Sequence, residues 1–276
     1  MRLISFEHAG RASWGRVEGP EVVDLGAAHG APADLKAAIA LGADMTGEAP
    51  RIARADVRLL PIIPNPSKIL CVGHNYESHR VETGRDKTQF PSIFTRFADT
   101  LIGAEDPIIR PAVSTDLDFE AELAVVIGKG GRNIPEDKAM DHIAGLSCFN
   151  DASVRDWQWH TRQFIPGKNF PGTAPFGPEL VTLEEISDMD QVRVESRLNG
   201  EVMQSATLDH MLFSIPVIIA YVSTFTPLSP GDVIATGTPG GVGAKRTPPV
   251  WMKAGDKIEV SVSGVGTLTS LIRDEA

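Results

Sequence analysis

Acidic and apolar residues alternate at the start of DFEAELAVVIG, residues 118–128. In an extended strand alternate side chains share a face, so the carboxylates of Glu120 and Glu122 would lie side by side. The same face continues as Ala124 and Val126, which indicates a strand that is buried on both faces. Two buried carboxylates repel each other unless a cation lies between them. The pattern predicts a site for Mg²⁺, Mn²⁺ or Ca²⁺, although a solvated strand face is the alternative.

Asp151 is the natural third ligand, because it ends the apolar stretch AGLSCFN and opens DASVRDWQ. Arg155 and Gln158 follow at i+4 and i+7, on the same helical face as Asp151 if a helix begins at once. A row of Asp, Arg and Gln would form the polar wall of a substrate site. The structural alternatives are that Asp151 caps a helix, and that the Asp–Arg pair is an exposed ion pair of little energetic value.

A histidine and a glutamate form a second candidate group. His79 and Glu82 lie three residues apart in NYESHRVETG, which predicts a short helix, so their side chains can touch. A glutamate that accepts from one imidazole nitrogen fixes the tautomer and leaves the other nitrogen as a base. The alternative is a surface H-x-x-E without a function.

Two loops rich in glycine and proline carry further polar residues. Lys168 lies in IPGKNFPG, where a rigid loop can hold an ammonium group against an anionic intermediate; an ordinary surface lysine is the alternative. The loop ATGTPGGVG follows a predicted strand but does not fit the dinucleotide-binding pattern G-x-G-x-x-G. Its main-chain amides and Thr238 could still bind a carboxylate.

The elements expected to position these residues are mainly strands joined by hairpins. Strands are predicted at residues 2–6, 13–19, 21–26, 68–73, 92–97, 118–128, 144–151, 192–203 (with an Asn199–Gly200 turn), 232–237, 257–264 and 266–274. Helices are predicted at 31–42, 75–84 (with Asn75 as N-cap), 135–143, from 153, and within 208–225. These elements indicate an α+β fold with a curled sheet or β-roll. Prolines at 61, 64 and 66 predict a boundary near residue 65, between a small module (1–65) and the main domain (66–276).

Composition narrows the function classes. The chain has 276 residues, of which 42% are hydrophobic, and a net charge of −10, which argues against a nucleic-acid partner. Cys71 and Cys148 lie in apolar stretches and are expected to be buried, reduced thiols. No apolar run is long enough to span a bilayer, and no signal peptide is visible. We therefore expect a cytoplasmic protein without a membrane partner.

Together these stretches resemble the fumarylacetoacetate hydrolase family, in particular its bacterial acylpyruvase-like and 2-hydroxyhepta-2,4-diene-1,7-dioate isomerase-like members. The matching pieces, in the family's order, are KILCVGHNYESH, DFEAELAVVIGKGGRNI, FNDASVRDWQ, PGKNF, FGPELVT, GDVIATGTPGGVG and AGDKIEVSVSGVGTL. The resemblance implies a mixed β-sandwich roll as catalytic domain, a small β-rich N-terminal domain and a homodimer.

The resemblance also implies roles for the candidate residues. Mg²⁺ or Mn²⁺ would be held by Glu120, Glu122 and Asp151, and His79 with Glu82 would be the dyad that activates water. Lys168 would face the substrate's oxo group, Gln158 would contact substrate or water, and Thr238 would contact a carboxylate.

Two departures from the family pattern bear on the substrate. Larger fumarylacetoacetases have a further metal-binding carboxylate before the histidine, where this chain has CVGHNY, so that activity itself is not expected. Arg96 stands where many relatives have lysine, and we expect it to bind a distal substrate carboxylate. The expected reaction is metal-dependent hydrolysis of a C–C bond in a 2,4-dioxo acid, an acylpyruvate or fumarylpyruvate, in the breakdown of aromatic or sugar acids. The alternatives are isomerisation, oxaloacetate-type decarboxylation or lyase chemistry at the same site, and a non-catalytic metal-binding module.

Overall fold

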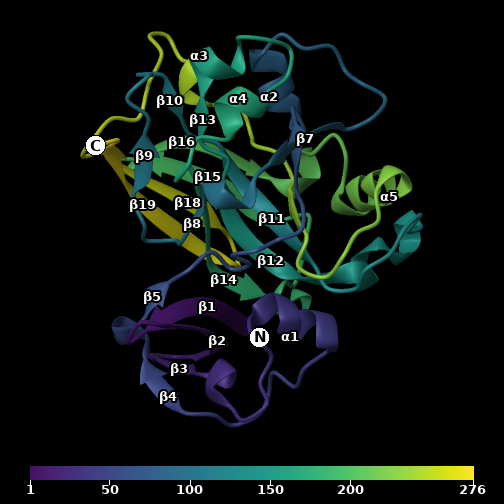
Figure 1. The fold of residues 1–276 in the computed structure, drawn as a ribbon. Coiled ribbons are helices and arrows are strands. Elements are labelled where there is room, and N and C mark those ends of the chain that lie inside the picture. Colours follow the sequence, from purple (N-terminus) through teal and green to yellow (C-terminus); the bar gives the residue numbers. More distant parts are fainter.

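The computed structural model describes residues 1–276 and consists mainly of β-strands (Figure 1). The strands are β1 (Arg2–His8), β2 (Arg11–Glu18), β3 (Glu21–Val23), β4 (Arg51–Ala53), β5 (Arg58–Leu59), β6 (Ile69–Gly73), β7 (Ser92–Arg96), β8 (Leu101–Ile102), β9 (Ile108–Arg110), β10 (Leu117–Asp118), β11 (Ala121–Ile127), β12 (Ile143–Asn150), β13 (Ser153–Val154), β14 (Ala174–Val181), β15 (Arg193–Leu198), β16 (Glu201–Thr207), β17 (Val233–Ala235), β18 (Lys257–Val262) and β19 (Gly266–Asp274). The α-helices are α1 (Leu35–Leu41), α2 (Glu77–Glu82), α3 (Arg155–Gln158), α4 (Ile165–Lys168) and α5 (Ile215–Phe225). Short 3-10 helices are η1 (Leu25–Ala27), η2 (Arg54–Asp56), η3 (Ala98–Thr100), η4 (Glu136–His142), η5 (Leu183–Glu185), η6 (Leu208–His210) and η7 (Gly243–Lys245). The expected α+β class is confirmed.

Two sheets pack against each other in the main domain. The larger sheet has the strand order β4-β3-β2-β1-β14-β12-β11-β17-β6-β7, with β5 beside β1 and β8 beside β14. The smaller sheet has the order β16-β15-β18-β19-β9, and β10 and β13 form a separate pair. Most neighbours are antiparallel, but β6 and β17, β8 and β14, and β9 and β19 are parallel pairs. This is the roll expected from the sequence.

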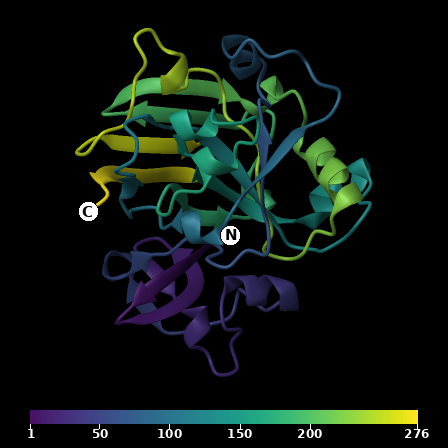
Figure 2. The same ribbon diagram turned by 45° about the horizontal axis from the view of Figure 1, so that its top comes forward.

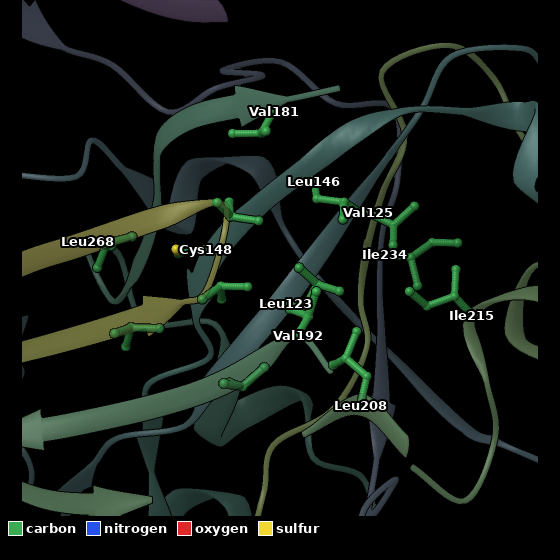
Figure 3. Close-up of a cluster of buried hydrophobic side chains, with 14 of the residues drawn as sticks. Leu123, Val125, Leu146, Cys148, Val181, Val192, Leu208, Ile215, Ile234 and Leu268 are labelled. Atoms are coloured by element: carbon green, nitrogen blue, oxygen red, sulfur yellow. The ribbon is translucent and has the colours of Figure 1, made fainter. Parts of the chain in front are cut away.

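Strand β11 lies inside the large sheet and is buried on both faces. Leu123 and Val125 pack in the cluster between the two sheets (Figure 3). Ala124 and Val126 face a second cluster that includes Leu35 of α1. A slip of one residue would exchange these two faces, so the register of the strand is strongly specified. The core therefore fixes the position of the acidic residues at the start of β11.

The N-terminal segment forms a smaller module beside the main domain, coloured purple in Figures 1 and 2. Strand β1 pairs with β14, with Leu3 opposite Leu180, so the module extends the large sheet. Helix α1 begins after Asp34, whose carboxylate accepts a hydrogen bond from the Ala37 N–H, and ends at Gly42 in the left-handed conformation. Helices α2, α3 and α4 gather at the opposite end of the main domain (Figure 1).

Several predicted helices are shorter than expected. Asn75 does not cap α2: its side chain bonds main-chain groups of Phe213 and Thr236 instead, because the tertiary fold offers it those partners. The stretch 135–143 forms the 3-10 helix η4 rather than an α-helix, and the helix expected from residue 153 is only α3. The stretch 208–225 divides into η6 and α5.

The acidic stretch 118–128 is not one continuous strand. Asp118 belongs to β10, which pairs with β13, whereas β11 begins at Ala121. Phe119 and Glu120 lie in the break between the two strands. Asp118 therefore belongs to a different strand pair from the one that places Glu122.

Other local predictions are confirmed. Asn199 and Gly200 both have positive φ and connect β15 to β16, as the Asn-Gly pair predicts. Cys71 and Cys148 are buried and not joined in a disulfide. None of the helices combines the length and apolar character that crossing a membrane requires.

Candidate active site

Three buried carboxylates meet where β11 begins and β12 ends. These strands are antiparallel neighbours, with Ala121 opposite Asn150, so the start of one lies beside the end of the other. The Asp151 N–H donates to the Glu120 carbonyl oxygen at 2.9 Å. Carboxylate oxygens of Glu120, Glu122 and Asp151 all lie within 4.8 Å of one another. The structure thus brings the three predicted metal ligands together.

The chemistry of this triad fits a divalent cation. Oxygen donors alone suit hard ions such as Mg²⁺ or Mn²⁺ better than Zn²⁺. Glu122 has no ion-pair partner, and its carboxylate accepts only from the Gly237 N–H, at 2.8 Å. Burial and the charges of Asp151 and Glu120 raise the pKa of Glu122 well above its usual range. A carboxylate in this environment requires either a proton or a cation, and a divalent ion would remove the repulsion.

Two buried cations balance the other two acids. Lys168 Nζ lies 2.7 Å from Glu120 Oε2 and 2.6 Å from Asp151 Oδ2. Arg155 Nη2 lies 2.7 Å from Glu120 Oε1. Burial opposes the charged form of Glu120, but Lys168 and Arg155 outweigh it and hold the pKa of this carboxyl below its usual range. Burial likewise opposes the ammonium form of Lys168, but Asp151 and Glu120 raise its pKa above the ordinary value.

The main chain of the glycine-rich loop after β17 donates hydrogen bonds to acidic side chains of this chain. Its main-chain N–H groups donate to three carboxylates at 2.8 Å each: Gly237 to Glu122, Gly241 to Glu82, and Gly243 to Asp118. A Cβ at Gly243 would lie 1.9 Å from the Val250 carbonyl oxygen, so this close approach requires glycine. The sequence predicts that amides of this loop could bind a carboxylate; the three named here donate to side chains of this chain and are not free for a substrate.

Asp118 joins this loop to helix α3. The fully buried carboxylate accepts from Arg155 Nε at 2.8 Å and from the Ala244 N–H at 3.1 Å, in addition to Gly243. Arg155 in turn contacts Glu120. Asp118 therefore positions the arginine that touches the triad and anchors the loop that borders it.

Replacement of Asp118 by asparagine is expected to destabilise the protein, because the buried Arg155 guanidinium would lose one of its two anionic partners. Breaking a buried pair costs about 3–5 kcal/mol, so the unfolding temperature of EDTA-treated protein should fall by roughly 10 °C. Asp116→Asn is the matched control: it lies two residues earlier, has no ion-pair partner, and should shift unfolding by about 1 °C or less. Equal unfolding temperatures for the two variants would contradict the role of Asp118.

His79 lines the same cavity as Glu120 and Glu122, and its partner Glu82 does not line it. His79 Nδ1 lies 2.7 Å from Glu82 Oε1. Because an ionised carboxylate only accepts, Nδ1 carries the proton, and Nε2 of the neutral ring is left as a base. The ring stacks on His74 with centroids 5.2 Å apart. Burial and the neighbouring His79 lower the pKa of His74 to about 4, so His74 is neutral at physiological pH.

One cavity collects most of the predicted site residues. Its lining includes His79, Glu120, Glu122, Arg155, Gln158, Lys168 and Thr238. The side-chain oxygen of Gln158, Oε1, accepts from Arg155 Nη1 at 2.9 Å, which leaves the side-chain amino group to donate to a ligand. The Thr238 hydroxyl donates to the Ala121 carbonyl at 2.9 Å and accepts from Gln204 at 2.7 Å. The hydroxyl proton of Thr238 is therefore committed to Ala121 and is not free for a substrate carboxylate.

Arg96 does not line the cavity, and the prediction that it binds a distal substrate carboxylate is wrong. Its side chain is fully buried, with Nη1 2.6 Å from Asp151 Oδ1 and Nη2 2.6 Å from the Thr173 hydroxyl. The guanidinium binds Asp151 Oδ1, whereas Lys168 contacts Oδ2 of the same carboxylate. Arg96 and Asp151 are 55 positions apart, so no local pattern could reveal this pair.

Residues 68–273 match the fumarylacetoacetate (FAA) hydrolase C-terminal family. This chain belongs to the fumarylacetoacetate hydrolase family. Oxaloacetate tautomerase fahd2, mitochondrial, of Xenopus laevis is 42% identical over 221 residues, which cover 79% of this chain and 69% of that protein. Oxaloacetate tautomerase YisK of Bacillus subtilis is 42% identical over 222 residues, 79% and 74% of the two chains. The solved structure of fumarylacetoacetate hydrolase (EaFAH) from Exiguobacterium antarcticum has a TM-score of 0.90 and 37% identity, with both chains fully covered.

The cavity of this fumarylacetoacetate hydrolase family member also contains residues that sequence reasoning missed. They are His74, Arg85, Trp159, Phe164 and Lys245. They come from loops and helix ends, where no periodic pattern marks a buried or ligand-facing side. The sole local signal is that His74 directly follows the predicted strand 68–73 and precedes the helix that carries His79.

Proposed function

We propose that this chain catalyses keto–enol tautomerisation of oxaloacetate or a closely related 2-oxo dicarboxylic acid. The observation that carries the proposal is that His79 lines the same cavity as Glu120 and Glu122, two of the three clustered carboxylates. Moving a proton between carbon and oxygen requires a base beside a site that stabilises an enolate, and no attacking water. The similarity to two proteins named oxaloacetate tautomerases favours this isomerisation over the C–C hydrolysis expected from the sequence.

His79 supplies the base in this reaction. Its Nε2 accepts the proton as the C3–H bond breaks, and the imidazolium is stabilised by the Glu82 carboxylate at Nδ1. The same imidazolium then donates the proton to the 2-oxygen, so that one proton moves from carbon to oxygen and nothing is consumed. Lys168 and Arg155 line the cavity beside Glu120, and their charges hold the pKa of that carboxyl below its usual range, which keeps it ionised.

The cation that we propose is Mg²⁺ or Mn²⁺, with Ca²⁺ as a further possibility, held by Glu120, Glu122 and Asp151. When bound, such an ion polarises a carbonyl oxygen and stabilises enolate charge. Glu120 and Asp151 already accept from Lys168, but each ionised carboxylate has about four lone-pair sites, so the ammonium and an ion can share them.

The test follows the ultraviolet absorbance of enol-oxaloacetate as it converts to the keto form. Mn²⁺-loaded protein should accelerate this conversion, and EDTA should remove the acceleration because the triad is left without its cation. Undiminished activity in EDTA would contradict a metal-dependent site. Release of pyruvate and CO₂ in the same samples measures decarboxylation. If pyruvate is released as fast as the enol disappears, the reaction is decarboxylation rather than tautomerisation.

Hydrolysis of a 2,4-dioxo acid such as an acylpyruvate is the second candidate. It is favoured by the similarity along the whole chain to the solved fumarylacetoacetate hydrolase structure. His79 would then take a proton from water rather than from carbon. A higher kcat/KM for acylpyruvate cleavage than for oxaloacetate tautomerisation would reverse the order of the two candidates.

A further inference from the structure

Two cations of the cavity lining have no anionic partner. Arg155 and Lys168 are held in buried ion pairs, whereas Arg85 and Lys245 form no salt bridge. The only acids that line the cavity, Glu120 and Glu122, belong to the triad. In a chain with a net charge of −10, two uncompensated cations on one cavity favour an anionic ligand group.

Arg85 extends from the end of helix α2, one residue after Gly84. Two hydrogen bonds to Arg80 fix the main chain of Arg85. The Arg85 N–H donates to the Arg80 carbonyl at 3.1 Å, and the Arg85 carbonyl accepts from Arg80 Nη1 at 2.6 Å. The side chain itself is exposed. Arg85 nevertheless lines the same cavity as His74 and His79.

Lys245 approaches from the glycine-rich loop. It ends η7, which begins at Gly243, the residue whose N–H is bound by the buried Asp118 carboxylate. Lys245 Nζ lies 6.0 Å from the centre of the Trp159 ring, which directly follows α3 and also lines the cavity. The anchor at Gly243 and the contact with Trp159 both restrict where the ammonium can lie.

We propose that Arg85 and Lys245 bind the distal carboxylate of a 2-oxo dicarboxylic acid. This inference rests on the proposed function, in which the 2-oxo acid end of the substrate lies between the triad and His79. The second carboxylate of a diacid lies at the opposite end of the molecule. Arg85 and Lys245 are the lining cations that no protein carboxylate has taken, and charge-assisted hydrogen bonds to a carboxylate are stronger than neutral ones. The two residues would therefore select diacids over 2-oxo monoacids.

The test compares oxaloacetate with its 4-monoethyl ester on the Mn²⁺-loaded protein. The two compounds share the enolisable 2-oxo acid, and only the first has a distal charge. Wild-type protein should show a KM for oxaloacetate about 10-fold or more below that for the ester. Arg85→Gln and Lys245→Gln should each raise the KM for oxaloacetate about 5–10-fold, and together about 30–100-fold, with kcat nearly constant.

The ester is the control for the site formed by the triad and His79, because its KM and kcat should change less than about 2-fold in the same variants. Lys87→Gln is the matched control variant: Lys87 is an exposed cation two residues after Arg85 and does not line the cavity, and its loss should leave both substrates unaffected. An equal loss with oxaloacetate and with the ester, or no loss with either, would overturn the inference.

Failure of the proposed function gives a different result. If wild-type protein converts neither compound, tautomerisation is excluded, and calorimetric titration of the Mn²⁺-loaded protein with both compounds then measures binding alone. Tighter binding of oxaloacetate than of the ester, with the difference lost in the double variant, supports the carboxylate site. Equal binding of the two compounds by wild-type protein overturns it.

Discussion

In protein stripped of divalent cations with EDTA, Glu122→Gln is expected to unfold at a higher temperature than wild type, and with saturating Mn²⁺ at a lower one. The buried Glu122 carboxylate faces Asp151 and Glu120 without an ion-pair partner. A glutamine keeps a carbonyl oxygen for the Gly237 N–H and offers an amino group to the neighbouring acids. Removing one uncompensated charge should stabilise the metal-free protein by about 1–2 kcal/mol, or roughly 2–8 °C.

Without metal, the difference in unfolding temperature between wild type and Glu122→Gln should grow as the pH rises. Since the folded-state pKa of Glu122 is raised, its contribution to stability is fully present below the ordinary glutamate pKa and is lost as pH rises through the folded value. The unfolding temperatures of wild type and variant should therefore diverge as the pH is raised from about 4.3. Thermal unfolding in EDTA over a series of pH values measures this divergence.

Mn²⁺ reverses the order because a bound ion stabilises only the folded state, by about 2.7 kcal/mol at a concentration of 100 Kd. Loss of a ligand should weaken Mn²⁺ binding at least about 100-fold and reduce tautomerisation by about 10³-fold or more.

Glu179→Gln is the control, because this buried glutamate pairs with Arg2 and Arg54 and not with the triad, and its loss should destabilise the protein with and without metal. A Glu122→Gln protein that binds Mn²⁺ like wild type would exclude Glu122 as a ligand.

Sequence reasoning located the acids because strand geometry is local and regular. The spacing of Glu120 and Glu122 predicts two neighbouring carboxylates, and they do lie together although Glu120 immediately precedes β11; the apolar residues that follow require the strand to be buried. Helical spacing does the same for His79 and Glu82. The break in the strand after Asp118 was not visible, since it depends on pairing with β13 and on the anchor to Gly243.

The contacts that orient the acids were beyond the reach of local patterns. The sequence predicts a substrate contact for Arg96, yet the packing of β7 places its guanidinium against Asp151. The sequence predicts that Asn75 caps a helix, but its side chain hydrogen-bonds the main chain of Phe213 in the loop before α5. In both cases a polar side chain binds a segment that is distant in sequence, and only the assembled fold brings the two segments together.

His79→Gln is expected to reduce kcat for tautomerisation by roughly 10²–10⁴-fold while Mn²⁺ affinity changes less than about 3-fold. The imidazole is the base in the proposed reaction, but it is not among the carboxylates of the triad. Glu82→Gln should cause a smaller loss, about 10–100-fold, because the base remains and only the charged hydrogen bond at Nδ1 is weakened. Enol conversion and Mn²⁺ titration on the same samples separate turnover from metal binding.

A change at any buried histidine can disturb the fold, so His142→Gln serves as the matched control. His142 is buried, and its Nδ1 lies 2.7 Å from the Lys129 carbonyl oxygen, away from the cavity. This variant should keep kcat within about 2-fold of wild type below its unfolding temperature. Parallel loss of Mn²⁺ affinity and turnover in His79→Gln would mean that the histidine supports the metal site and is not the base. Wild-type turnover in that variant would assign proton transfer to another group in the cavity.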